Sequence, residues 1–172
     1  PRWFRDPLRA FTEKETMPGA IERNRSHEFS HEIITKMARL GLLGVPFAEE
    51  YGGAGGDNLS YAIAVEEISR GDGSLGLTLA AHTSLGASPF YLYGTPEQKR
   101  KYLVPLAQGK MIGAFGLTEA HACPDADRTT TARVQHGGPA VLNRSNPHPT
   151  PAPTPTLSAY PPPTHPPPTP PP

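Results

Sequence analysis

The residues best suited to catalysis by type and spacing are two histidines and a glutamate in the stretch HEFSH, from His27 to His31. On a continuous helix, histidines four residues apart share a face and can both bind zinc, and Glu28 would then activate a zinc-bound water for hydrolysis. Such a site also needs a third ligand and a histidine face that lines a cleft. The apolar residues Ile33 and Met37 place the buried face elsewhere, which favours two solvated histidines near a helix start over a zinc hydrolase.

A second candidate lies where an apolar run, Met111 to Leu117, has the period of a strand and meets a polar turn. The turn could hold a ligand, but Thr118 and Glu119 at a strand end have no specificity of their own. The turn continues to Cys123, which is the only cysteine. One cysteine allows neither an internal disulfide nor a thiolate metal cage, which fits a reducing compartment.

Helices are predicted for most of the first hundred residues, and prolines and glycines mark their ends. The first is expected near Pro7 to Thr16, before Pro18 and Gly19. A second should end at Gly41 and carries one apolar stripe at spacings of three and four. This stripe consists of Phe29, Ile33, Ile34, Met37 and Leu40.

Three further helices are expected before the strand. Asn58 or Ser60 would cap a helix that ends at Gly71 to Gly73. Its apolar side comprises Leu59, Ala62, Ile63 and Val65, while its polar side, facing water or other polar groups, comprises Glu66, Glu67 and Arg70. The apolar stretch 74–94 predicts a helix buried between others, and Thr95 and Pro96 begin one more helix that Gly109 ends.

Composition excludes several classes of protein. Sixteen basic and sixteen acidic residues give a net charge of zero, and no basic cluster is interleaved with aromatics, which argues against a nucleic-acid partner. No apolar run reaches the roughly 18 residues of a membrane span, and the first residues lack an apolar signal core. We therefore expect a soluble protein of the cytoplasm, or of the mitochondrial matrix in a eukaryote.

Most of the 23 prolines lie beyond Asn146, where no apolar periodicity is left. This composition predicts a disordered Pro-rich tail over 144–172. The tail could adopt polyproline II and dock in the aromatic groove of an SH3-like or WW-like module, although out-of-frame reading of a GC-rich gene explains the composition better. The expected fold is mainly α: an up-and-down helical bundle over 1–109, a truncated β-region over 110–143, and the tail.

The order of these segments resembles a known family. The helical segments and the strand are carried by LGLLGVPFAEEYGGAGGDNLSYAIAVEEISRGDGSLGLTLAAHTSLGASPFYLYGTPEQKRKYLVPLAQGKMIGAFGLTE. This stretch is similar to the amino-terminal helical domain and first middle-domain strand of the flavin-dependent acyl-CoA dehydrogenases, and the similarity runs from about Phe4 to Asn143. The resemblance implies FAD-dependent α,β-dehydrogenation of an acyl-CoA thioester in a homo-oligomeric enzyme.

The resemblance also implies roles for individual residues. Those at the edge of the flavin ring would be Phe115, Gly116, Leu117 and Thr118, where fixed donors stabilise the negative charge of the reduced ring. Those lining the acyl pocket would be Leu85, Ser88 and Pro89.

The chain departs from the family at the turn that follows Glu119. The family has the pattern T-E-P-x-A-G-S-D at this turn. This chain has Ala120, Cys123 and Pro124 where the pattern has proline, glycine and serine, so the substrate-bonding serine is absent. No segment resembles the second helical domain, which carries the glutamate base, and no catalytic residue is assigned. We therefore expect an inactive fragment of such an enzyme. The alternatives are a non-catalytic helical module with a Pro-rich interaction tail and, behind it, the zinc hydrolase.

Overall fold

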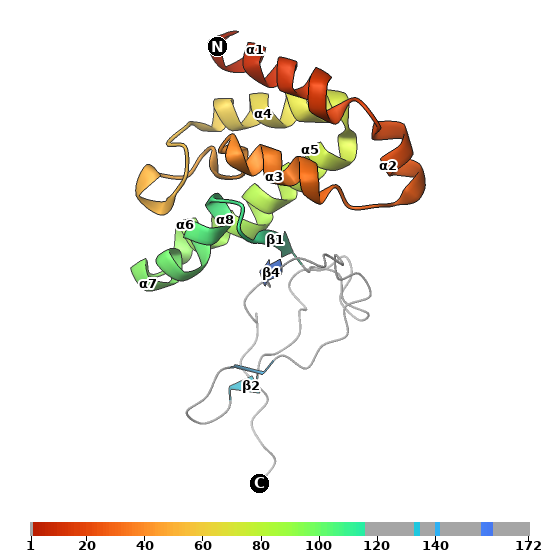
Figure 1. The fold of residues 1–172 in the computed structure, drawn as a ribbon. Helices are drawn as coiled ribbons and strands as arrows, with labels where there is room; N and C mark the ends of the chain where they lie inside the picture. The colour runs from red at the N-terminus through yellow and green to blue at the C-terminus, as the bar shows by residue number, and fades with distance from the viewer. Residues whose placement is uncertain (1, 116–132, 135–139, 142–155, 160–172) are drawn as a thin grey trace.

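The computed structural model describes residues 2–115, 133–134, 140–141 and 156–159, and its described part is mainly helical, as the sequence predicts (Figure 1). The first half contains three α-helices, of which the first continues into a π-helical turn; they are α1 (Arg2–Phe11), the turn Thr12–Thr16, α2 (Ala20–Ser26) and α3 (His31–Arg39). Two 3-10 turns follow, at Leu42–Gly44 and Glu49–Tyr51.

The second half contains five α-helices, two of them continued by π-helical turns. They are α4 (Asn58–Gly71), α5 (Gly73–Ala80), the turn Ala81–Ala87, α6 (Ser88–Tyr93), α7 (Pro96–Gln98), the turn Lys99–Leu103 and α8 (Val104–Ala107). Among these described residues, no helix has the length and apolarity that a membrane crossing requires.

Within the described residues, four short strands form two pairs. Strand β1 (Ile112–Phe115) pairs in parallel with β4 (Thr156–Ala159), and β2 (Arg133–Val134) pairs antiparallel with β3 (Ala140–Val141). Figure 1 shows β1 and β4 side by side. Residues 156–159 lie in the stretch for which the sequence predicts a disordered tail, and their backbone forms a strand ladder with β1. The rest of that stretch lies outside the described residues, so the tail stays a prediction.

N-terminal caps begin the helices, and glycines end them, largely where the sequence predicts. Thr95 forms a capping box with Gln98, and Gly41 and Gly109 follow α3 and α8 with φ of 72° and 69°. The predicted cap of α4 is wrong, because its N-cap is Asp57, whose carboxylate accepts a hydrogen bond from the backbone N–H of Ser60.

The main core lies between α1, α3, α4 and α5 and reaches β1. Its buried side chains include Ile34, Met37, Leu43, Ala64, Ile68 and Leu79. The apolar stripe predicted for α3 is confirmed in Ile33, Ile34 and Met37, which are all buried, and is wrong at Leu40, which is 54% exposed. A smaller cluster forms around Phe47, Leu103 and Leu106.

The predicted apolar side of α4 is wrong at Leu59, which is 61% exposed. The prediction that Glu67 faces water or other polar groups holds through polar groups, because its side chain is only 1% exposed and lies among arginines. One of these is Arg9 of α1, a helix that begins at Arg2 rather than near Pro7, contains that proline, and lies along α4 (Figure 1). The stretch 74–94 is also not buried on all sides, since Leu77 is 69% exposed.

Glu67 is the centre of an ion-pair cluster that joins α1 to α4. Its carboxylate lies 2.9 Å from Arg9, 3.3 Å from Arg5 and 3.3 Å from Arg70. The hydrogen bond from Arg9 is the main cause that holds the pKa of Glu67 below its usual value. Its neighbour Glu66, with a 60% exposed side chain, binds only to Arg5, at 2.7 Å.

Candidate functional site

The residues expected at the flavin edge begin at the end of β1. Phe115 is the last residue of this strand and is half-buried. The other three, Gly116, Leu117 and Thr118, lie outside the described residues, as do the departures from the family turn at Ala120, Cys123 and Pro124. The structure therefore shows how the strand reaches the site, and the roles of these residues stay predictions.

Strand β1 packs directly on the π-helical turn Ala81–Ala87. The contact is between backbones, since a Cβ added to Gly86 would lie 2.5 Å from the Cα of Gly113. A distance that short cannot be accommodated without moving one of the two segments. Glycine at both positions therefore allows the strand to approach the turn this closely.

A buried histidine adds a polar link at the same contact. The backbone N–H of Gly113 donates a hydrogen bond of 2.9 Å to Nδ1 of His82, whose side chain is fully buried. Burial lowers the pKa of His82 to about 4, against an opposing effect of the backbone carbonyls of Leu106 and Leu43. Sequence reasoning missed this residue, although a single histidine in an apolar stretch was a signal for it.

The residues expected in the acyl pocket lie where the π-helical turn meets α6. Leu85 is 45% exposed, and Pro89 is in the first turn of α6. The Ser88 hydroxyl donates a hydrogen bond of 2.8 Å to the backbone oxygen of Thr83, so its hydrogen is already used within the turn. The structure places the three close together in the chain, and their substrate role remains a prediction.

The geometry required for zinc binding by HEFSH is not present. His27 follows the last residue of α2 with a left-handed φ of 55°, and His31 is the first residue of α3. The two histidines therefore belong to different helices and do not share a helical face. In the described part of the chain, no group of three or more histidine, cysteine or acidic side chains is placed to hold a metal ion.

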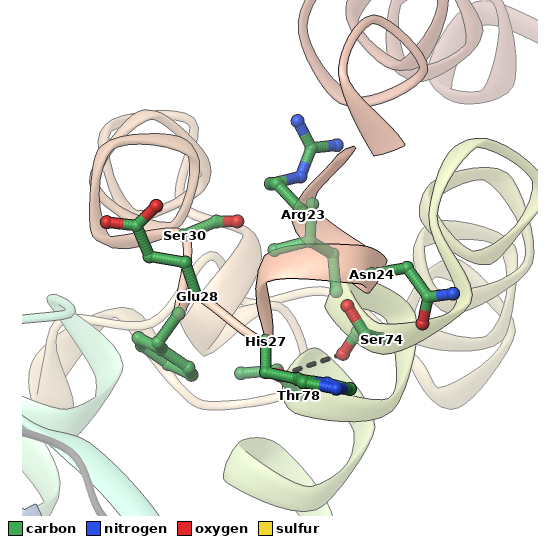
Figure 2. Close-up of a pocket in the computed structure, with 9 residues that line it drawn as sticks. Arg23, Asn24, His27, Glu28, Ser30, Ser74 and Thr78 are labelled. Carbon is green, nitrogen blue, oxygen red and sulfur yellow. Dashed lines mark hydrogen bonds between the residues drawn. The ribbon is translucent and has the colours of Figure 1, made fainter. Parts of the chain in front are cut away.

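The HEFSH segment instead lines a cavity of about 320 Å³ between the end of α2 and the start of α5. Figure 2 shows Arg23, Asn24, His27, Glu28 and Ser30 around it, together with Ser74 and Thr78. Arg23 donates to Asp72 through Nε and Nη2, at 3.1 and 2.9 Å, and Asp72 also caps α5. The charges at this cavity thus hold α2 and α5 together.

The helical domain, in which β1 packs through glycines on the turn Ala81–Ala87, matches a known family. The model of the acyl-CoA dehydrogenase N-terminal domain matches residues 2–110. The short-chain specific acyl-CoA dehydrogenase of Clostridium acetobutylicum is 50% identical over 141 residues, which are 82% of this chain and 37% of that enzyme.

Solved structures agree with this match. Butyryl-CoA dehydrogenase from Megasphaera elsdenii matches with a TM-score of 0.71 and 42% identity, covering 76% of this chain and 35% of that one. An acyl-CoA dehydrogenase complexed with FAD from Bacillus anthracis matches with a TM-score of 0.68 and 38% identity, covering 73% and 21%.

The fold is thus that of the helical domain of a flavoprotein dehydrogenase. The chain belongs to the acyl-CoA dehydrogenase family, as its sequence predicts, and matches the amino-terminal part of it. It spans about 37% of the length of the curated relative from Clostridium acetobutylicum.

Proposed function

We propose that this chain provides the amino-terminal helical domain of an FAD-dependent enzyme that α,β-dehydrogenates an acyl-CoA thioester. The observation that supports this most strongly is the docking of β1 on the turn Ala81–Ala87 within a domain that matches the family over residues 2–110. The helices of the domain thereby hold the end of β1, at Phe115, in a fixed position. Sites on such supported elements hold their groups more accurately than sites on free loops.

FAD, when bound, would accept the hydride in this reaction. The part of this chain would be to hold the ring edge with Phe115, Gly116, Leu117 and Thr118. Phe115, at the supported end of a strand, fits this role. Backbone donors fixed along such a strand stabilise negative charge without having to reorganise when the charge appears.

Leu85, Ser88 and Pro89 would form one wall for the acyl chain. The exposed side chain of Leu85 supplies apolar surface for such a wall. The names of the relatives from Clostridium acetobutylicum and Megasphaera elsdenii make butyryl-CoA the first substrate to test. Homo-oligomerisation, and a location in the cytoplasm or the mitochondrial matrix, belong to the same proposal.

The isolated 172-residue chain should not hold the cofactor. Large cofactors are retained by burying most of their surface in a formed cleft. Ala120, Cys123 and Pro124 replace the residues that shape the turn beside the flavin in the family. We expect a colourless protein on gel filtration, and no bleaching of added FAD by butyryl-CoA. A yellow protein whose flavin is reduced by butyryl-CoA would contradict this expectation.

A domain exchange tests the proposal itself. Residues 2–115 would replace the corresponding segment of the Clostridium acetobutylicum enzyme, with the unaltered enzyme as control. The proposal expects a yellow hybrid protein whose flavin is bleached by butyryl-CoA. A hybrid that folds and assembles like the control but stays colourless would refute it. The alternative of a helical module with a free Pro-rich arm is weakened by the pairing of β4 with β1.

A further inference from the structure

We propose that His82 is a positioning residue that fixes β1, up to its end at Phe115, by accepting a hydrogen bond from Gly113. The inference rests on the proposed function only in placing the flavin at the end of β1. The hydrogen bond itself can be tested without any cofactor.

The geometry places this bond inside the strand rather than at its end. Gly113 is the second of the four residues of β1, and its backbone nitrogen lies 2.9 Å from Nδ1 of His82. Gly86, one helical turn after His82, meets the same strand residue through its backbone. A polar contact and a steric contact thus fix both the height and the register of β1 on the turn.

The bond defines the chemical state of the ring. A nitrogen that accepts a hydrogen bond carries no hydrogen, so the neutral ring of His82 must have its hydrogen on Nε2. A protonated ring has two donors and could not accept from Gly113. The elements packed most closely against the turn are α5, α6, α8, β1, β4 and Leu42–Gly44, and the ionisable side chains of these segments are the tyrosines of α6. Tyr61 of α4 also contacts the turn, at Ser84. No acidic side chain among them therefore favours the charged ring.

The second ring nitrogen indicates that His82 does more than fill space. Nε2 of His82 is buried and has no well-aligned hydrogen-bond partner within the described residues, although the backbone carbonyls of Leu106 and Leu43 lie near the ring. A buried polar atom without such a partner destabilises a fold, so an apolar side chain would be more stable if the site only had to be filled. The hydrogen bond that the ring does make is the one from Gly113, which an apolar side chain could not accept.

The test compares three variants of the full 172-residue chain by NMR. His82→Asn keeps an acceptor, Oδ1, close to the place of Nδ1, and His82→Leu removes it. Ser84→Ala is the matched control, because Ser84 lies on the same turn and its hydroxyl donates a hydrogen bond to the backbone oxygen of Ala80. The readouts are the ring ¹⁵N shifts of His82 and the hydrogen exchange of the Gly113 amide.

The proposal expects the ring hydrogen on Nε2 in the native chain. His82→Leu should accelerate exchange of the Gly113 amide about tenfold, as loss of one hydrogen bond implies, while His82→Asn and Ser84→Ala should stay within about threefold of the native rate. A ring hydrogen on Nδ1, rapid exchange at Gly113 in the native chain, or equal exchange in the Leu and Asn variants would overturn it. The ring shifts decide the matter even if a variant does not fold.

The hybrid enzyme then tests the effect on the flavin. In the hybrid, His82→Leu should weaken FAD retention about tenfold, and His82→Asn should keep it within about threefold of the unmutated hybrid. The reason is that the position of β1 beside the flavin depends on an acceptor for the Gly113 N–H. Equal retention in the two variants would refute the positioning role. A native hybrid without FAD would refute the proposed function, and the ring shifts of His82 would still report on the hydrogen bond.

Discussion

The clearest quantitative consequence of the structure is an acid dependence of stability that comes from His82. The ordinary pKa of histidine is 6.5, and burial lowers that of His82 to about 4. The folded protein therefore keeps the ring neutral in a pH range where the unfolded chain takes up a proton. The stabilising contribution is complete above pH 6.5 and is lost as the pH falls to about 4.

The size of this effect follows from the shift. A difference of about 2.5 pKa units, at about 1.4 kcal/mol per unit, corresponds to about 3.5 kcal/mol of unfolding free energy, of which about 3 kcal/mol is lost by pH 4. For a domain of this size that is a large fraction of the total stability. The effect should be absent from His82→Asn, because asparagine does not titrate.

Urea unfolding of the native chain and of His82→Asn at pH 7, 5.5 and 4 measures the effect. The native chain should lose about 3 kcal/mol more than the variant between pH 7 and pH 4. Glu67 and Asp72, whose pKa values are lowered, lose their own contributions at lower pH and do so equally in both proteins. Two parallel curves of stability against pH would refute the burial of a neutral ring at this site.

Three further predictions concern other contacts. Glu67→Gln should lower the free energy of unfolding by about 1.5–3 kcal/mol, because it removes charged hydrogen bonds of a buried carboxylate. The exposed control Glu66→Gln should change it by less than about 1 kcal/mol, and equal effects of the two variants in urea unfolding would contradict the ion-pair cluster. Gly86→Ala should cost about 1–3 kcal/mol through contact with β1, whereas Gly73→Ala, which has open space, should be neutral or slightly stabilising, as thermal unfolding will show. Elemental analysis should find no stoichiometric zinc in the purified protein and no change in His31→Ala; one zinc per chain that depends on His31 would contradict the break in the helix.

The sequence predicted those parts of the fold that depend on near neighbours. Gly41 and Gly109 end helices because their left-handed backbone suits glycine, and Thr95 begins one because its partner Gln98 is three residues away. The first helix was placed too late because Pro7 suggested a start, although it lies inside α1. The burial of Glu67 depends on arginines about sixty positions earlier, which no local pattern reveals.

The candidate site was predictable only in part, for the same reason. Phe115 could be named from the family resemblance, and its strand was visible in the local period. His82 and Gly113 are 31 residues apart, so their bond appears only when the chain has folded. HEFSH was misleading because its spacing assumes a continuous helix, and a left-handed backbone at His27, rare for a residue other than glycine, interrupts it.

The attachment of α1 to the rest of the domain has a consequence for local opening. Leu8 is the one buried side chain of this helix, with Phe4 and Phe11 partly buried beside it, and charges attach it through Glu66 and Glu67. Dissolved salt screens the exposed pair of Arg5 with Glu66, and it screens the pairs of the buried Glu67 much less. Rising ionic strength should therefore loosen the start of α1 at Arg5 while Arg9 stays bound to Glu67, and only full departure of the helix would return the carboxylate of Glu67 to water.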